Sequence, residues 1–155
     1  MKQPFTYLLI FLCVGFTFAQ EQPVYIGNQV EQMPVFPGCE EFEDNKPLSA
    51  SCFSEKFSEA IAESLNTSFM DEIFRGQNLK EVKTKIKFKV SREGKIEDIT
   101  MIENGNQTLF DQVRIAISRI NQNYLIEPAK NGENPMNFNM SLPILYKVPK
   151  KVKNK

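Results

Sequence analysis

The strongest constraint on the fold is a strict alternation between positions 82 and 90. Four lysines alternate there with residues that are mostly apolar. The lysines are Lys83, Lys85, Lys87 and Lys89, and the others are Val82, Thr84, Ile86, Phe88 and Val90. A period of two residues predicts a β-strand with one face in the core and the other in water. The lysine row could also bind an anion, but a solvated sheet face is the commoner explanation for such a row.

A hairpin and a second strand are expected after this first strand. The run Ser91 to Gly94 predicts a tight turn, because Gly94 can adopt a positive φ. The return strand is expected over 95–103, but its apolar residues lose the alternation near Glu97 and Asp98. That loss predicts either a β-bulge or partial burial of both faces.

Two stretches with apolar residues every three or four positions predict amphipathic helices. The first helix is expected to begin after Ser51, and its apolar stripe is Phe53, Phe57, Ile61 and Leu65. The apolar stripe of the second helix consists of Leu109, Val113, Ala116, Ile117 and Ile120. Asn106 or Thr108 is the expected cap of this second helix. A shorter helical segment is indicated around Phe69, Ile73 and Phe74.

The last predicted strand carries a second clear alternation. Its apolar positions are Phe138, Met140, Leu142, Ile144, Tyr146 and Val148. Pro143 lies within this run and has no N–H to donate, which predicts a strand at a sheet edge or one with a bulge. A polar connection is expected before it, over 121–135.

The order of elements is helix, strand, hairpin, strand, helix, strand. It predicts an α+β fold, in which a three-stranded antiparallel sheet has two helices packed on one face. The strand over 82–90 has the strongest pattern and is placed at the centre of the sheet. The last strand then forms an open edge.

The N-terminus has the composition of a secretory signal peptide. Lys2 precedes an apolar run from Phe5 to Phe18, which the small residue Ala19 follows. About 14 apolar residues fall short of the roughly 20 of a transmembrane helix, which favours cleavage after Ala19 over an inner-membrane anchor. Lipidation at Cys13 is disfavoured, because bulky residues precede it where a lipobox has small ones. The expected location is the periplasm.

Four regions follow from this pattern. We expect a signal peptide at 1–19, an irregular, proline-containing arm at 20–51, one folded domain at 52–148 and a basic, disordered tail at 149–155. The stretch from 20 to 155 is within the usual size of a single domain.

Cys39 and Cys52 form an even pair in a chain that is expected to be exported. An oxidising compartment favours a disulfide between them, which would tie the arm to the first helix. Two free thiols are the alternative. The spacing does not match a Cys-x-x-Cys redox motif, and without histidine these thiolates are a poor set of zinc ligands.

The composition disfavours several classes of function. The 19 basic and 19 acidic residues balance, whereas nucleic-acid-binding proteins usually have a basic excess. The chain has no histidine, and no serine or cysteine lies beside a recognisable base, so we predict no enzyme activity and no cofactor. The acidic cluster Glu40, Glu41, Glu43 and Asp44 lacks the spacing of a calcium loop and is more typical of a solvated turn.

Four stretches, in their order and spacing, resemble the C-terminal domain of TonB, in the small stand-alone form of Bacteroidetes-type bacteria. They are Pro34-Val-Phe-Pro-Gly-Cys-Glu40, Cys52-Phe-Ser-Glu-Lys56, Lys87-Phe-Lys-Val-Ser-Arg-Glu-Gly-Lys-Ile96, and Pro128-Ala-Lys-Asn-Gly132 leading to Leu142-Pro-Ile-Leu-Tyr146. The resemblance covers nearly the whole chain after the signal peptide. It implies a periplasmic module that grips a segment of an outer-membrane TonB-dependent receptor and transmits force from inner-membrane motor proteins.

The open last strand gives this implied function a mechanism, the addition of an extended peptide as a further strand. The predicted partner-binding residues are Asn137, Phe138, Asn139, Met140, Ser141, Leu142, Ile144 and Tyr146. Their backbone would supply affinity, and the outward side chains of Asn139 and Ser141 would adjust specificity. A chain cleaved after Ala19 could hold a receptor segment but could not pull it. The alternative is a self-associating structural or adaptor protein, a homodimer paired through the same edge.

Overall fold

The computed structural model of the protein describes residues 30–102 and 104–150. The expected signal peptide at 1–19 and residues 151–155 of the expected tail lie outside this range. Within it, none of the helices has the length and apolar character that crossing a membrane requires.

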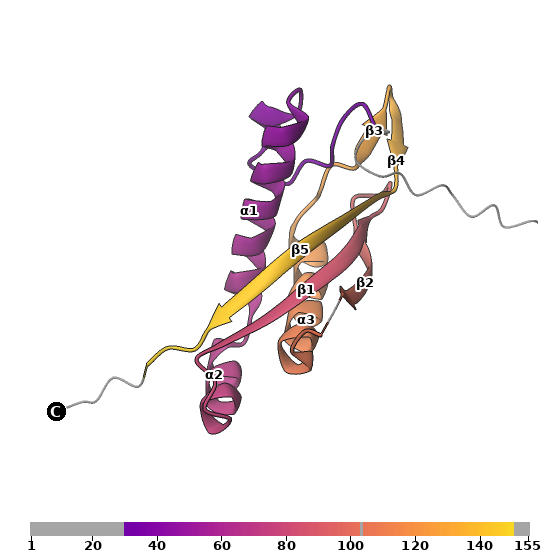
Figure 1. The fold of residues 1–155 in the computed structure, drawn as a ribbon. Helices are drawn as coiled ribbons and strands as arrows, with labels where there is room; N and C mark the ends of the chain where they lie inside the picture. Colours follow the sequence, from indigo (N-terminus) through magenta and orange to yellow (C-terminus); the bar gives the residue numbers. More distant parts are fainter. Residues whose placement is uncertain (1–29, 103, 151–155) are drawn as a thin grey trace, which may run out of the picture.

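The main sheet has three antiparallel strands in the order β2-β1-β5 (Figure 1). They are β1 (Glu81–Val90), β2 (Ile96–Ile102) and β5 (Phe138–Lys147). The even-numbered residues of β1 are buried and the odd-numbered ones are exposed or half-buried, as their alternation predicts. The predicted α+β fold, with the first strand at the centre and the last strand at an edge, is confirmed.

Three α-helices accompany the sheet in the described part of the chain. They are α1 (Lys46–Ser64), α2 (Thr67–Gly76) and α3 (Gln107–Asn123). Helices α1 and α3 lie on the same face of the sheet, and α2 follows α1 at the end where β1 begins (Figure 1). Each helix begins after an asparagine whose side-chain oxygen accepts a hydrogen bond from a backbone N–H of the first turn, namely Asn45, Asn66 and Asn106. The prediction of Asn106 as a cap is confirmed.

The core lies between the apolar face of the sheet and helices α1 and α3. Phe53 and Phe57 of α1 are fully buried, and each packs its ring within 6.5 Å of the Phe88 ring of β1, centre to centre. Burial of one such side chain stabilises a fold by about 1.5–3 kcal/mol. The spacing of four residues along α1 therefore fixes which face of this helix meets the sheet.

A bulge interrupts the pairing of β1 with β2. Their register shifts between Lys87 and Lys89, and Asp98 has a φ of 52°. The Lys89 ammonium lies 2.7 Å from the Asp98 carboxylate. The bulge predicted near Asp98 is confirmed, and so is the turn before it, because Gly94 has a φ of 72° and its N–H donates to the carbonyl of Ser91.

A small hairpin between α3 and β5 holds the arm that precedes α1. Its strands are β3 (Ala129–Asn131) and β4 (Asn134–Met136). Gln32 pairs with Lys130, and Val35 pairs with Glu127, in isolated antiparallel bridges. Val30, Met33, Ala129 and Phe138 form a second, smaller apolar cluster. The described part of the arm is thus packed onto the domain.

The irregular arm expected over 20–51 ends earlier than predicted. After a single 3-10 turn at Glu40–Phe42, α1 begins at Lys46 rather than after Ser51. Pro47 lies in the first turn of α1, where a helix has no hydrogen-bond partner for an N–H, so proline is tolerated there. Cys52, which the sequence placed at the start of the helix, therefore lies in its second turn.

The polar connection expected over 121–135 also needs correction. Helix α3 continues to Asn123, and β3 and the first residues of β4 occupy 129–135. Strands of three residues are too short to show a period of two, so the sequence pattern could not reveal them. Pro135 lies within β4, in a two-stranded sheet in which both strands are edges, and such edges accept proline.

Candidate functional site

Strand β5 forms one edge of the main sheet. It pairs with β1 through ten consecutive residue pairs, from Glu81 with Lys147 to Val90 with Phe138, without a shift in register. In the order β2-β1-β5, no strand of the described residues lies on its other side. The strict alternation of its sequence explains this regularity, because the even-numbered side chains enter the core opposite those of β1.

The hydrogen bond beyond the end of β5 shows which of its backbone groups face outward. The N–H of Val148 donates to the carbonyl of Lys80 at 2.9 Å. Hydrogen-bonded and non-hydrogen-bonded pairs alternate in an antiparallel ladder, so the even-numbered residues of β5 bond to β1 and the odd-numbered ones face away. Pro143 is odd-numbered, and its missing N–H therefore costs the sheet no bond.

The outward backbone groups belong to Asn139, Ser141, Pro143, Leu145 and Lys147. Apart from Pro143, which has only a carbonyl, each offers one N–H and one C=O. Within the described residues, no backbone hydrogen bond outside the regular elements involves any of these five residues. They form the row of exposed donors and acceptors to which a further strand could add; we call this row the β5 edge.

The structure separates the predicted partner-binding residues into two groups. Phe138 and Leu142 are buried, and Met140, Ile144 and Tyr146 pack partly against the core. These side chains fix β5 in place, while Asn139 and Ser141 lie at the outward positions. Asn137 precedes the strand, and its side-chain oxygen accepts a hydrogen bond from the N–H of Arg92.

Two parts of the site were not predicted. Leu145 is 48% exposed and lies at an outward position of β5. A groove of about 500 Å³ lies beside the second half of β5 and is lined by α1 as well, with Ser58, Glu59, Ile61, Ala62, Leu65, Thr67, Pro143, Ile144, Leu145 and Tyr146 around it. We call it the α1–β5 groove. Because no residue of β1 lines it, it lies on the open side of β5. The run of small residues on one flank of α1 is the only sequence signal for it.

The far end of β5 is anchored to α2. The hydroxyl of Tyr146 donates to the carboxylate of Asp71 at 2.6 Å, and Arg75 forms an ion pair with the same carboxylate at 3.1 Å. Burial, followed by the bond to Asp71, raises the pKa of Tyr146 to about 12. The phenol therefore keeps its proton to a higher pH than an ordinary tyrosine, and its hydroxyl holds the end of the strand in place.

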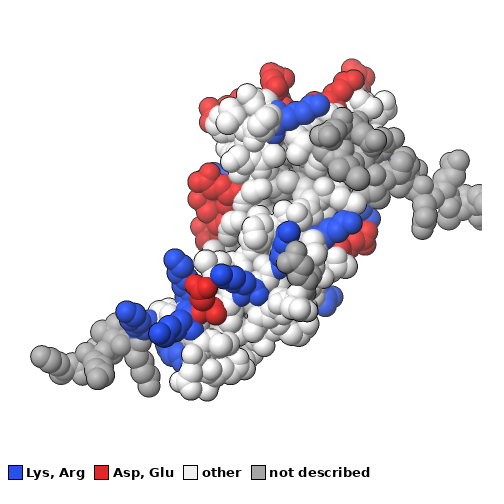
Figure 2. Space-filling view, viewed as in Figure 1, with Lys and Arg blue, Asp and Glu red and all other residues white. Residues whose placement is uncertain are grey.

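Charge is distributed unevenly over the molecule. Figure 2 shows acidic side chains along the outer flank of α1 and at the end that carries the arm, and basic side chains gathered near the end of β5. On the flank of α1, Glu55, Glu59 and Glu63 are exposed at intervals of four residues. On the open face of the sheet, the lysines of β1 lie one strand away from the β5 edge. The β5 edge thus runs between an acidic helix flank and a basic sheet face.

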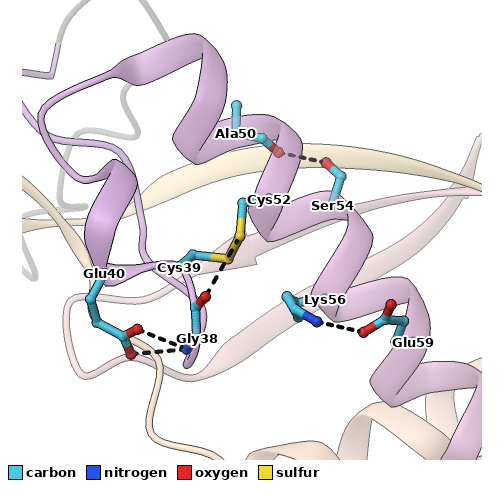
Figure 3. Close-up of a disulfide and its surroundings, with 8 residues drawn as sticks. All are labelled: Gly38, Cys39, Glu40, Ala50, Cys52, Ser54, Lys56 and Glu59. Carbon is cyan, nitrogen blue, oxygen red and sulfur yellow. Dashed lines mark hydrogen bonds and ion pairs between the residues drawn. A yellow bond between two sulfur atoms is a disulfide. The ribbon is translucent and has the colours of Figure 1, made fainter.

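The predicted disulfide between Cys39 and Cys52 is present (Figure 3). The two Cα atoms are 5.9 Å apart. Cys39 is fully buried, next to Phe36, whose ring packs against Phe53. The bond joins the arm to the second turn of α1.

The acidic cluster at 40–44 contains the 3-10 turn Glu40–Phe42, just before α1. The carboxylate of Glu40 accepts the N–H of Gly38 at 2.9 and 3.0 Å, and this bond lowers the pKa of Glu40 (Figure 3). Among the residues that the structure describes, no group of three or more cysteine, aspartate or glutamate side chains could hold a metal ion.

Comparison with known protein families gives no match for this sequence, and no curated protein matches it.

Proposed function

We propose that this protein is a periplasmic protein-binding domain that resembles the C-terminal domain of TonB. It engages an extended segment of an outer-membrane TonB-dependent receptor by β-strand addition, in support of outer-membrane transport. The segment pairs with the β5 edge, and its backbone provides most of the hydrogen bonds.

One observation carries the proposal, namely that the odd-numbered residues of β5 direct their backbone groups away from the sheet. A regular edge of ten residues is longer than most natural edges, which are usually shortened, bulged or covered. An incoming strand can pair there without any rearrangement of the domain, since even-numbered residues already hold β5 to β1.

The other edge of the sheet is less suitable. Strand β2 has seven residues, and its bulge at Asp98 breaks the regular row of donors and acceptors. Bulges and charges at an edge are the devices that prevent pairing with another chain. The contrast between the two edges supports β5 as the binding strand.

The disulfide supports the location. Disulfides persist in oxidising compartments such as the bacterial periplasm and are rare in the cytosol. The pair of cysteines agrees with export directed by the N-terminal segment, and it lies within two of the stretches that resemble the TonB domain.

A proline at position 141 tests the proposal. The N–H of Ser141 faces away from β1, so Ser141→Pro removes a donor from the β5 edge and no bond from the sheet, as Pro143 does in the native chain. We expect this variant to fold and to bind the periplasmic segment of a TonB-dependent receptor at least about tenfold more weakly, through a lost backbone bond and a poorer fit. Ser141→Ala keeps the N–H and is the matched control, which should bind within about twofold of the wild type.

The measurement is a pull-down of receptor from solubilised outer membranes, followed by titration of a synthetic peptide of the receptor segment. Equal binding by the wild type and the proline variant, or binding by neither, would refute strand addition at β5. A stable dimer that buries β5 against its own copy would instead support the self-associating alternative.

A further inference from the structure

An added strand would have different surroundings on its two faces. Its inner face would lie over α1, because α1 flanks the open side of β5 and lines the α1–β5 groove. Its outer face would continue the open face of the sheet, which carries the lysines of β1. Successive side chains of a strand point to opposite faces, so the two faces select different residues.

The inner face favours apolar side chains. Ile61, Ala62 and Leu65 line the α1–β5 groove. The hydroxyl of Ser58, which also lines it, donates to the carbonyl of Ser54 at 2.6 Å. Its one donor is therefore used within the helix.

An acidic side chain is disfavoured on this inner face. Glu59 lines the groove, and Glu55 and Glu63 lie one turn before and one turn after it on the same flank of α1. Lys56 forms an ion pair with Glu59 at 3.0 Å, but three glutamates against one lysine leave this flank net acidic, which repels a further carboxylate.

The outer face favours an acidic side chain at one position. Lys87 pairs with Ser141 across β1 and β5, is exposed, and forms no ion pair within the described residues. Strands are about 4.8 Å apart, which places an added strand about 9.6 Å from β1. An extended lysine and a glutamate can span this distance together, because Ser141 between them is short.

We propose, on the basis of the strand addition above, that the occupant is an extended peptide with two defined side chains. An acidic residue lies opposite Ser141 and faces Lys87. An apolar residue lies opposite Ile144 and enters the α1–β5 groove. The spacing of three residues is odd, so the two side chains point to opposite faces of the peptide.

The probes are synthetic peptides of ten residues with a fluorescent label, built from alternating threonine and valine. One peptide has glutamate three residues before leucine, and a second has the reverse order, since the two orders correspond to the two directions of an added strand. Each is also made with lysine in place of glutamate, and with serine in place of leucine. Binding to the purified protein is followed by fluorescence anisotropy.

The acidic position of the peptide is tested by reversing the charge of Lys87 and then the charge of the peptide side chain. With Lys87→Glu, the glutamate peptide should bind about fivefold more weakly, and the lysine peptide should recover that loss, because an exposed ion pair is replaced by repulsion and then restored. Lys46→Glu changes the net charge equally at an exposed site on the first turn of α1, and it should leave both affinities unchanged.

The groove is tested by filling it. Ala62 is exposed on α1, so Ala62→Trp occupies the α1–β5 groove without entering the core. It should weaken the leucine peptide by at least about tenfold, the effect of losing one buried apolar side chain, and should affect the serine peptide little. Ser118→Trp fills the corresponding groove beside α3 and is the control.

The outcomes separate this inference from the proposed function. If a peptide binds, is weakened by Ser141→Pro, but is indifferent to Lys87→Glu and to Ala62→Trp, strand addition stands and the inferred peptide chemistry is wrong. If only one of the two variants has its effect, the inference fails for the other side chain. If no peptide of either charge binds while the receptor is retained in the pull-down, the inferred peptide chemistry is wrong, and if neither peptide nor receptor binds, the proposed function itself is contradicted.

Discussion

At single positions, backbone geometry decides which residues the fold tolerates. Gly94 combines a φ of 72° with close contact, because a Cβ there would lie 1.9 Å from the carbonyl oxygen of Ile126. Gly132 has a similar φ of 60° but nothing within 4 Å of such a Cβ, and Gly76 has neither constraint. Sequence reasoning predicted the positive φ of Gly94, but the contact with Ile126 depends on residues far apart in the chain.

Alanine substitutions at these three glycines distinguish the cost of a positive φ from the cost of a steric clash with a neighbouring residue. We expect Gly94→Ala to lower the free energy of unfolding by about 3 kcal/mol or more, Gly132→Ala by about 1 kcal/mol, and Gly76→Ala to change it by less than about 1 kcal/mol. Urea denaturation followed by circular dichroism measures all three. Equal losses at Gly94 and Gly132 would contradict the close contact with Ile126.

Tyr146 links stability to alkaline pH. Its pKa of about 12 lies above the ordinary value of 10.0, so the folded protein holds the phenolic proton more tightly than the unfolded chain does. The resulting stabilisation is complete below pH 10 and is lost as the pH rises towards 12. We expect Tyr146→Phe to lower the free energy of unfolding by about 1 kcal/mol near neutral pH. The difference between wild type and variant should shrink between pH 10 and 12, and a constant difference over that interval would argue against the bond to Asp71.

Helices and strands with a long periodic pattern of apolar residues could be predicted from the sequence. Elements that begin at a proline, or that are too short to show a period, could not. The alternation of β1 and β5, the stripe of α3 and the bulge at Asp98 all follow from sequence. The start of α1 was missed because Pro47 usually marks a break, yet in the first turn it is compatible with a helix. The β3–β4 hairpin was missed because its strands are too short to show a period.

The disulfide is the cross-link between two such elements, the arm and α1. Replacement of both Cys39 and Cys52 by serine should lower the free energy of unfolding by about 3 kcal/mol, since the unfolded chain regains the freedom of the closed loop. Urea denaturation provides the measurement, and the wild type under reducing conditions should show the same loss. An unchanged stability in both cases would mean that the arm gains nothing from the bond.

For the whole molecule, the decisive feature is a sheet whose edge strand β5 lies beside α1, with the α1–β5 groove between them. The identity of the edge strand could be predicted, because Pro143 has no N–H and so cannot donate to a second strand on the side away from β1. The direction of the backbone groups needed the hydrogen bond from Val148 to Lys80, and the α1–β5 groove needed the packing of α1 next to β5. Neither is present in any local pattern, because each depends on two segments that are distant in the chain.

Amide hydrogen exchange of β5, residue by residue, tests whether this edge is open and receives a strand. In the free protein, the amides of Met140, Leu142 and Ile144 should exchange slowly, and those of Ser141 and Leu145 should exchange fast, because the former bond to β1 and the latter face outward. Addition of a bound peptide should slow Ser141 and Leu145 and leave the others unchanged. Slow exchange at Ser141 and Leu145 before any partner is added, or fast exchange there after it binds, would contradict the account.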